Sequence, residues 1–383
     1  MRVLFTSAAG LGHIHPTIPL ARAAARAGDE VLFAVATEAV PTVERFGFAA
    51  LPIPYGDPAD LGRAWTSLPD HDLNTYVVAE IFTRIQGLAA LPAQQAAIRE
   101  FRPDLVIANE ISSHVAAESC GVPSAYLGIT ALDLADLTWD PVVAAANDLR
   151  AAAGLPPSTR LPYETAVRYL SPVPPLLWND PTRLPADWIW YRHQDPEEEV
   201  PAAPSLDAAA STRRSRPRIY ATLGSMAGRN DFSGPVFAAM LSALGRLDAD
   251  VLFTIGPLDP GAIAEPPANV TVSAYEPQSR AMQCDAAVIH AGSGTTVAAL
   301  ARGLPLVAVP LFADQMHNAD RLAAAQLAIR VDPGEIGERL TTAVETVLGD
   351  PVYAANAHSV ARAIAARPTP GQAIDLLRSA VSE

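Results

Sequence analysis

Short apolar runs alternate with stretches of helical periodicity through both halves of the chain. In the first half, the apolar runs are residues 2–7, 30–35, 105–108 and 124–127. In the second half, they are residues 251–255, 270–273, 286–289 and 306–309. Residues 16–27 predict a helix that ends at Gly28. This alternation indicates two doubly wound α/β domains, each built on a parallel sheet.

The two halves begin in the same way, with a short apolar run that opens into a glycine loop at residues 2–7 and 218–225. Between them, residues 172–204 are rich in proline and tryptophan, and residues 211–218 are polar and basic. We therefore predict a first domain at 1–205, a linker at 206–217 and a second domain at 218–370. The remaining segment, 371–383, has the pattern of an amphipathic helix.

Residues 285–318 are the most informative stretch of the chain. An apolar run leads into a glycine-rich turn at residues 290–294, a short helical pattern follows, and Gly303 precedes a second apolar run. This is the order strand, loop, helix, strand. In an open parallel sheet, ligands bind where the carboxyl ends of the strands meet such loops.

The chemistry of this loop favours an anion. Gly292 and Gly294 allow the backbone to approach a ligand closely. The helix that follows offers unpaired N–H groups and the positive end of its dipole. The neighbouring polar side chains are those of His290, Ser293, Thr295 and Thr296. Together these groups suit a diphosphate, and the alternative is a tight turn in which Ser293 or Thr295 only caps the helix.

One strand later, Asp314 and Gln315 stand side by side. A carboxylate and an amide in this arrangement can bind two neighbouring hydroxyl groups of a sugar. The alternative is an ordinary helix N-terminus, where Asp is common.

At this point the sequence resembles a known family. The blocks HAGSGTT and LPLVAVPLFADQMHNADRL resemble the donor-sugar signature of inverting GT-B glycosyltransferases that use nucleotide-diphosphate sugars, in particular the bacterial natural-product (antibiotic) branch. MRVLFTSAAGLGHIHP, RPDLVIANEISSHVAAESCGVPSA and RIYATLGS resemble further blocks of this family in the same order. The resemblance covers nearly the whole chain.

The resemblance implies a GT-B fold, in which two Rossmann-like domains face an interdomain cleft. It implies that the first domain binds a hydrophobic aglycone and that the second binds a TDP- or UDP-sugar. It also implies that residues 371–383 pack back on the first domain. Aromatic residues that could line an acceptor pocket, or equally belong to the core, are Trp65, Tyr76, Phe82, Trp139, Trp178, Trp188 and Trp190.

His13 is the candidate general base. It lies in the loop after the first strand, where a neutral imidazole could take a proton from an acceptor hydroxyl. The family's base is the first His of a G-H-x-x-P pattern, which is His13, whereas His15 falls at a variable position. The alternatives are a loop His that caps backbone groups and a surface His.

A carboxylate usually orients such a histidine. Many family members carry an Asp after the strand that begins P-D-L-V-V, but this chain reads PDLVIANE, with Asn109 and Glu110 there. We expect Glu110 to be the partner of His13, and an ordinary carboxylate at the sheet edge is the alternative. Asn109, Asp133 and Asp136 are further candidates.

The resemblance implies four more donor-side residues. Gly224 and Ser225 end the first strand of the second domain, where Ser225 could reach the diphosphate and Gly224 the nucleoside. Tyr275 and Gln278 belong to YEPQ, where many relatives have W-x-P-Q near the nucleotide base. Tyr275 could stack on a pyrimidine, although a core tyrosine is the alternative.

Composition excludes several function classes. A formal net charge of −14 argues against binding nucleic acid or an acidic membrane surface. Cys120 and Cys284 form neither a disulfide framework nor a metal motif. No stretch of 18 apolar residues lacks charges, so we expect no membrane span and a cytoplasmic protein, for which a homodimer is compatible with the sequence.

We expect no metal and no cofactor other than the nucleotide-sugar co-substrate. The D-x-D patterns at residues 248–250 and 70–72 lie in contexts that favour ordinary surface carboxylates. The predicted function is transfer of a sugar to a hydrophobic natural-product aglycone. The alternatives are a nucleotide-sugar epimerase or hydrolase on the same fold, a catalytically degenerate partner protein and, more weakly, a nicotinamide dehydrogenase.

Overall fold

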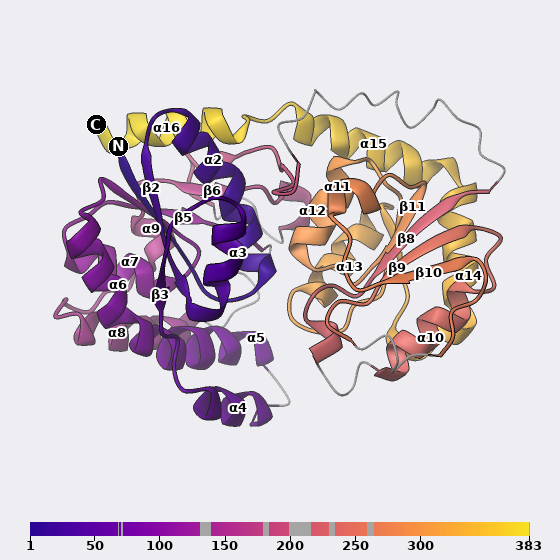
Figure 1. Cartoon of the computed structure of the whole chain (residues 1–383), viewed down its shortest axis with the longest axis horizontal. Coiled ribbons are helices and arrows are strands. Elements are labelled where there is room, and N and C mark those ends of the chain that lie inside the picture. Colours follow the sequence, from indigo (N-terminus) through magenta and orange to yellow (C-terminus); the bar gives the residue numbers. More distant parts are fainter. Residues whose placement is uncertain are drawn as a thin grey trace. The chain divides into compact units, whose positions relative to one another are not determined.

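In the part of the chain that the structure describes, the sheet of the first of two structural units has seven parallel strands. Several of them are labelled in Figure 1. The computed structural model describes residues 1–67, 69, 72–130, 139–178, 184–198, 216–229, 234–258 and 264–382. The first unit holds residues 1–173, 178–192 and 368–383, and the second holds residues 174–177 and 193–367.

In the described part of the first unit, the sheet order is β3-β2-β1-β4-β5-β6-β7. The strands are β1 (Arg2–Ser7), β2 (Glu30–Ala36), β3 (Ala50–Ile53), β4 (Leu105–Ala108), β5 (Ser124–Leu127), β6 (Tyr169–Ser171) and β7 (Ile189–Trp190). The helices are α1 (Leu11–Ile14), η1 (His15–Thr17), α2 (Ile18–Arg26), η2 (Thr37–Ala39), α3 (Val40–Arg45), α4 (Pro58–Thr66), α5 (Leu73–Tyr76), the π-helix η3 (Val77–Gly87), α6 (Leu88–Phe101), α7 (Ile111–Ser119), α8 (Trp139–Ala152), α9 (Pro162–Thr165) and α16 (Pro370–Ser382).

The described part of the second unit contains a six-stranded parallel sheet in the order β10-β9-β8-β11-β12-β13. The strands are β8 (Arg218–Thr222), β9 (Asp250–Thr254), β10 (Val270–Ser273), β11 (Ala286–Ile289), β12 (Leu306–Ala308) and β13 (Ala328–Arg330). The helices are η7 (Ala227–Arg229), α10 (Gly234–Leu244), α11 (Gln278–Ala281), α12 (Ser293–Ala301), α13 (Gln315–Ala324), η10 (Pro333–Glu335), α14 (Ile336–Gly349) and α15 (Pro351–Ala365), and the 3-10 turn η4 (Pro175–Leu177) also belongs to this unit. The two parallel α/β units that the sequence predicted are thus confirmed.

Burial explains why the strands form where the apolar runs lie. All four residues of β4 and all four residues of β11 are buried, as expected for strands covered on both faces. In the first core, the rings of Phe5 and Phe33 stack with centroids 5.2 Å apart. The helix expected from residue 16 begins at Ile18, because residues 15–17 form a tighter 3-10 turn in which Thr17 Oγ1 donates to the Ile14 carbonyl at 2.6 Å.

The strand register places the candidate site residues at the carboxyl edge of each sheet. Thr6 of β1 pairs with Ala108 of β4, so the loop that contains His13 and the residues after β4 start at the same edge. In the second sheet, Ile289 pairs with both Thr222 and Ala308, which brings the loops after β8, β11 and β12 together.

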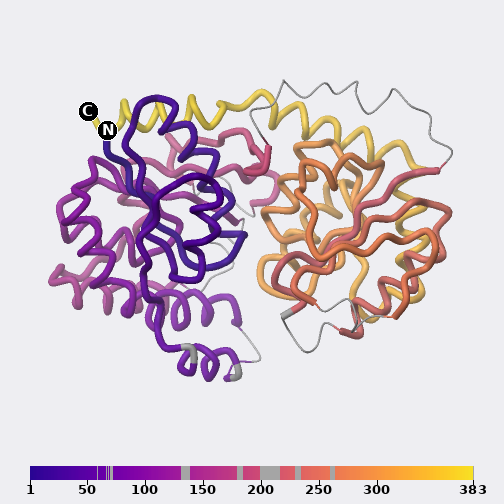
Figure 2. The backbone as a smooth tube through the Cα atoms, viewed as in Figure 1, coloured from indigo at the N-terminus to yellow at the C-terminus, as the bar shows by residue number. Residues whose placement is uncertain are grey.

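The C-terminal helix α16 packs against α2, in the first unit. Ala373, Ile374 and Leu377 are buried in its core. Arg378 pairs with Asp29 at 2.6 Å, and the same carboxylate binds the N-terminal ammonium group at 2.7 Å. The two chain ends therefore lie close together (Figure 2).

The domain division differs from the sequence prediction in two short segments. Residues 174–177 and 193–198 were expected in the first domain, but they belong to the second unit. The reason is a set of polar contacts: His317 Nε2 lies 2.7 Å from the Leu177 carbonyl, and Glu198 pairs with Arg302. Residues 206–215 of the expected linker lie outside the described residues.

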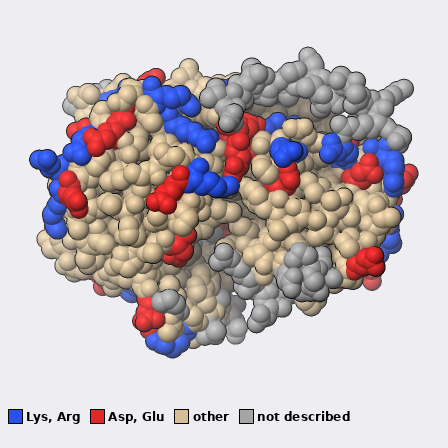
Figure 3. All heavy atoms as spheres, viewed as in Figure 1, with Lys and Arg blue, Asp and Glu red and all other residues tan. Residues whose placement is uncertain are grey.

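On the face seen in Figure 3, basic and acidic side chains are interspersed. Among the described residues, no helix is both long enough and apolar enough to span a membrane. Cys120 and Cys284 lie in different units, and both are free thiols.

Candidate active site

The glycine-rich loop connects β11 to α12 at the carboxyl edge of the second sheet. Ala291 has φ 61°, in the left-handed region, and Gly292 is the N-cap residue of α12. The Thr296 amide donates to the Gly292 carbonyl at 2.9 Å and so closes the first helical turn. Gly294 and Thr295 belong to that first turn, whose amides have no partners within the helix. The loop therefore has the geometry of an anion-binding helix N-terminus.

His290 is enclosed by two glycines from the loops that follow β8 and β11. A Cβ atom at Gly224 would lie 2.5 Å from His290 Nε2, and one at Gly292 would lie closer still. Gly224 also has φ 78°. Only glycine fits at either position while the imidazole stays in place. Gly224, which the sequence assigned to the nucleoside, thus packs against His290.

The His290 imidazole is neutral at physiological pH. Burial lowers its pKa to about 4, although the charge of Asp314 and a hydrogen bond with the Thr222 backbone act in the opposite direction. A neutral ring can donate one hydrogen bond. Among the described residues, Nδ1 of His290 is buried and has no hydrogen-bond partner.

Asp314 ties the start of α13 to the glycine loop. Its Oδ2 atom accepts hydrogen bonds from the Ser293 hydroxyl at 2.6 Å, the Ser293 amide at 3.2 Å and Asn318 Nδ2 at 3.1 Å. Ser293 is buried, so its hydroxyl contributes to this internal network. Asp314 is thus hydrogen-bonded to the glycine-rich loop at Ser293.

Asn318, which the sequence places near Asp314 but to which it assigned no role, joins this network. Its side chain is fully buried and donates to the Ala291 carbonyl at 2.9 Å. This bond holds the residue with left-handed backbone geometry. The available signal was the spacing of Asp314 and Asn318, which places them one turn apart on the same helix.

Gln315, the first residue of α13, was expected to share sugar hydroxyls with Asp314. The residue is 4% exposed. Its Oε1 atom accepts hydrogen bonds from the amides of Leu311 at 2.8 Å and Phe312 at 3.2 Å. The amide oxygen of Gln315 therefore holds the loop that precedes α13, where Ala313 has φ 57°.

The YEPQ segment lies beside the glycine loop. Gln278, the first residue of α11, donates from Nε2 to Thr295 Oγ1 at 3.1 Å. Tyr275 is 46% exposed, which rules out a core tyrosine, and its hydroxyl donates to Glu197 Oε1 at 3.2 Å. Ser225 follows Gly224 after β8 and is half-buried. The structure thus brings Gln278 and Thr295 together.

In the first unit, His13 lies on α1, just after β1. Its ring meets Phe82 of η3 edge to face, with centroids 6.1 Å apart. Phe82 in turn meets Trp65 of α4 at 6.5 Å. Phe82 is 39% exposed and Trp65 is 45% exposed. His13 therefore borders an exposed aromatic surface, whereas Trp178, another residue of the expected acceptor region, is buried in the core.

Asn109 contacts the backbone of His13. Its Nδ2 atom donates to the His13 carbonyl at 2.9 Å and lies 3.2 Å from the Ser7 hydroxyl. The side chain is almost completely buried. Asn109 thus positions the α1 turn through the main chain.

Glu110 has other hydrogen-bond partners than the one expected from the sequence. Its Oε1 atom accepts hydrogen bonds from Tyr55, from Gln94 Nε2 at 3.0 Å and from the Ser113 hydroxyl at 2.7 Å. Burial raises the pKa of Glu110 to about 7, and these hydrogen bonds only partly oppose that effect. The structure does not pair Glu110 with His13, and the further candidates Asp133 and Asp136 lie outside the described residues.

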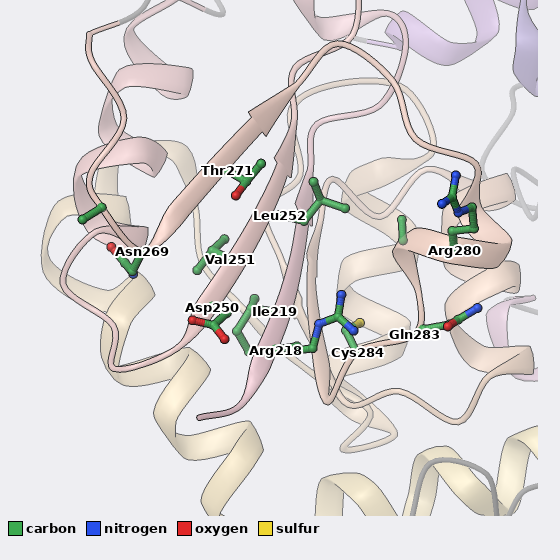
Figure 4. A pocket seen from close by; sticks show the side chains of 12 residues that line it. Arg218, Ile219, Asp250, Val251, Leu252, Asn269, Thr271, Arg280, Gln283 and Cys284 are labelled. Carbon is green, nitrogen blue, oxygen red and sulfur yellow. The ribbon is translucent and has the colours of Figure 1, made fainter. Parts of the chain in front are cut away.

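A pocket of about 330 Å³ lies at the opposite, amino-terminal edge of the second sheet (Figure 4). Arg218, Asp250 and Cys284 are among the residues that line it. Asp250 and Asp248 of the D-x-D pattern both pair with Arg216, at 3.8 and 2.9 Å. This pair of carboxylates is therefore remote from the glycine loop. Within the described ranges, no group of three or more His, Cys, Asp or Glu side chains could hold a metal ion.

Comparison with known proteins places this geometry in a family. Residues 238–379 match the model of the erythromycin biosynthesis protein CIII-like C-terminal domain. The L-demethylnoviosyl transferase of Streptomyces niveus is 30% identical over 401 aligned positions, which cover 97% of this chain and 96% of the relative. The chain belongs to the antibiotic-pathway glycosyltransferases.

Solved structures agree with the GT-B glycosyltransferase fold. SnogD from Streptomyces nogalater superposes with a TM-score of 0.77 at 25% identity, and the match covers 100% of this chain and 99% of that one. SsfS6 from Streptomyces sp. SF2575, solved with thymidine diphosphate, gives a TM-score of 0.77 at 23% identity, with 99% of each chain covered. The glycosyltransferase therefore shares its fold with these enzymes, and its glycine loop, α12 and α13 belong to that fold.

Proposed function

We propose that this glycosyltransferase is an inverting, metal-independent enzyme that moves a sugar from a TDP- or UDP-sugar to a hydrophobic natural-product aglycone. The observation that carries the proposal is the N-terminus of α12, where a neutral His290 is held between Gly224 and Gly292. Unpaired amides, a helix dipole and a neutral donor ring together stabilise a diphosphate leaving group.

The donor is assigned to the second unit. The diphosphate would lie against Gly294 and Thr295 of the first turn of α12, with Ser225 as a further hydroxyl donor. The carboxylate of Asp314 would accept hydrogen bonds from the sugar, and the exposed ring of Tyr275 would face the nucleobase. Because SsfS6 was solved with thymidine diphosphate, we favour TDP over UDP.

The acceptor is assigned to the aromatic surface of Trp65 and Phe82 beside His13. Flat apolar rings at this position suit an aromatic or macrocyclic aglycone.

The reaction follows from these assignments. An imidazole nitrogen of His13 accepts the proton of the acceptor hydroxyl, and the acceptor oxygen attacks the anomeric carbon from the face opposite the diphosphate. The new glycosidic bond forms as the anomeric carbon–oxygen bond to the diphosphate breaks. The nucleoside diphosphate leaves with that electron pair, so the anomeric configuration inverts. General-base catalysis of this kind contributes about 10²–10⁴-fold to the rate.

Calorimetric binding of TDP, UDP, GDP and NAD, each with magnesium and with EDTA, tests the donor assignment. We expect TDP or UDP to bind with an affinity that EDTA does not change. Binding of NAD alone, or of none of the four, would refute the proposed donor site. Consumption of donor at the full rate without an aglycone would indicate a hydrolase or epimerase instead.

A further inference from the structure

Residues 193–198 form a short segment that packs on the donor-site elements of the second unit. Asp195 is 7% exposed. Its Oδ2 atom accepts a hydrogen bond from the Ser279 amide, and its Oδ1 atom accepts one from the Glu197 amide at 2.9 Å. A carboxylate 84 positions away in the sequence therefore binds the first turn of α11.

Helix α11 has no side-chain cap of its own. Its N-cap residue is Pro277, whose side chain forms no capping hydrogen bond. Ser279 is the second residue of the helix, and its amide is one of those that an α-helix leaves unpaired. Asp195 supplies the missing acceptor from a distant segment, with a negative charge at the positive end of the helix.

The turn that Asp195 holds carries residues of the proposed donor site. Gln278, next to Ser279, donates to Thr295 in the first turn of α12. Tyr275 lies three residues before Gln278, and its hydroxyl binds Glu197 of the same segment. At the other end of α12, Arg302 pairs with Glu198. Residues 195–198 thus contact α11, the loop that precedes it, and the end of α12.

We propose that Asp195 is a positioning residue for the nucleoside side of the donor site. By holding α11, it sets the position of Tyr275 and of the Gln278 side chain before the nucleotide binds. Preorganisation of this kind raises affinity because the ligand does not have to order the turn itself. The inference rests on the proposed function, since it requires that a nucleoside diphosphate binds at this edge of the sheet.

Calorimetry with TDP and with inorganic pyrophosphate tests the role of Asp195. The variants are Asp195→Ala, which removes both acceptor atoms, and Asp195→Asn, which keeps one. The matched control is Asp285→Ala. In the same unit, Asp285 accepts a hydrogen bond from the Arg218 amide at 2.7 Å, but at the amino edge of the sheet. This control removes a comparable carboxylate–amide bond that is remote from the site.

We expect Asp195→Ala to weaken TDP binding by about five- to twentyfold, because only part of the free energy of the lost charge-assisted hydrogen bond is expressed as affinity. Pyrophosphate, which lacks the nucleoside, should keep its affinity within about twofold. Asp195→Asn should recover part of the TDP affinity, and Asp285→Ala should keep all of it. The KM of Asp195→Ala for the donor should rise while kcat changes little.

Three results would overturn the inference: unchanged TDP binding by Asp195→Ala, an equal loss of TDP and pyrophosphate affinity, or an equal loss in the Asp285→Ala control. Each of these presupposes that the wild-type protein binds TDP. A wild-type protein that binds no nucleoside diphosphate refutes the proposed function itself, so the two failures are distinguishable.

Discussion

The side chain of Asn109 donates a hydrogen bond to the main-chain carbonyl of His13 at 2.9 Å. Position 109, where a carboxylate could have faced the imidazole, thus carries an amide that donates to the main chain. The second contact of Asn109, to Ser7 at the end of β1, anchors the same turn to the sheet. Asn109 therefore holds the main chain of the α1 turn that carries His13.

This relationship gives an unusual prediction for Asn109→Asp. The substitution introduces the carboxylate that many relatives have, but it replaces a donor with an acceptor that faces the His13 carbonyl. We expect it to lower kcat rather than raise it, and to cost about 1–3 kcal/mol of stability. Steady-state kinetics and urea unfolding provide the measurements. An Asn109→Asp variant that is faster than the wild type would show that the introduced carboxylate reaches the imidazole.

Replacing His13 with alanine tests the general base. His13→Ala should lower kcat by about 10²–10⁴-fold while the dissociation constant for TDP stays within about twofold. The matched control is His15→Ala, two residues along the chain in η1, which should keep most of the turnover. Retention of full activity by His13→Ala would remove this residue as the base.

The two glycines around His290 predict a steric effect. Gly224→Ala and Gly292→Ala each place a Cβ atom against the imidazole, and Gly224→Ala also adds strain at φ 78°. We expect each variant to lose TDP binding by at least about tenfold and to lose about 1–3 kcal/mol of stability.

The control for these variants is Gly337→Ala in α14, where an added Cβ meets no atom within 4 Å. There the substitution should be neutral or stabilising, because Ala favours a helix over Gly by about 1 kcal/mol. Calorimetry and thermal unfolding separate the two effects. Wild-type TDP affinity in both Gly224→Ala and Gly292→Ala would show that the position of His290 does not matter.

Glu110 predicts a pH dependence of stability with a defined sign. Burial raises its pKa from the ordinary carboxyl value of 4.5 to about 7 in the folded protein. A raised carboxyl pKa means that the folded state holds the proton more tightly. The stabilising contribution is therefore complete below about pH 4.5 and is lost as the pH rises through 7.

Glu110→Gln keeps an acceptor oxygen for Tyr55, Gln94 and Ser113 and removes the charge. The stability of this variant relative to the wild type should therefore increase between about pH 5 and pH 8, by up to about 3 kcal/mol. Urea unfolding at both pH values measures this difference. A constant difference between Glu110→Gln and wild type would mean that Glu110 titrates normally.

The aromatic surface beside His13 predicts an effect on the acceptor alone. Trp65→Ala and Phe82→Ala should each raise the KM for a hydrophobic aglycone by about three- to tenfold, as expected for the loss of an aromatic contact, and should leave TDP binding unchanged. Leu376→Ala, which truncates a side chain on α16 that is 47% exposed, is the control. If aglycone kinetics are the same in all three variants, the acceptor binds elsewhere.

Local pattern was sufficient for much of the fold. The runs 105–108, 124–127, 270–273 and 286–289 coincide with β4, β5, β10 and β11. In β4 and β11 every residue is buried, and a strand covered on both faces must be apolar throughout. The order of strand, glycine loop and helix at residues 286–301 could also be predicted from the sequence. Glycine and the residues that start a helix determine the backbone conformation of only a few neighbouring positions. The family resemblance rested on the same local blocks.

Contacts between distant segments were decided only by the tertiary structure. The sequence placed Glu110 next to Asn109 but could not show that its carboxylate faces Tyr55 and Gln94. Likewise, Asp195 lies in a proline-rich stretch with no motif, yet it caps α11 84 residues later. Spacing along the chain determines which residues share a strand end or a helix face. Hydrogen-bond partners depend instead on how separate elements pack. Those elements come within hydrogen-bonding distance only in the folded chain.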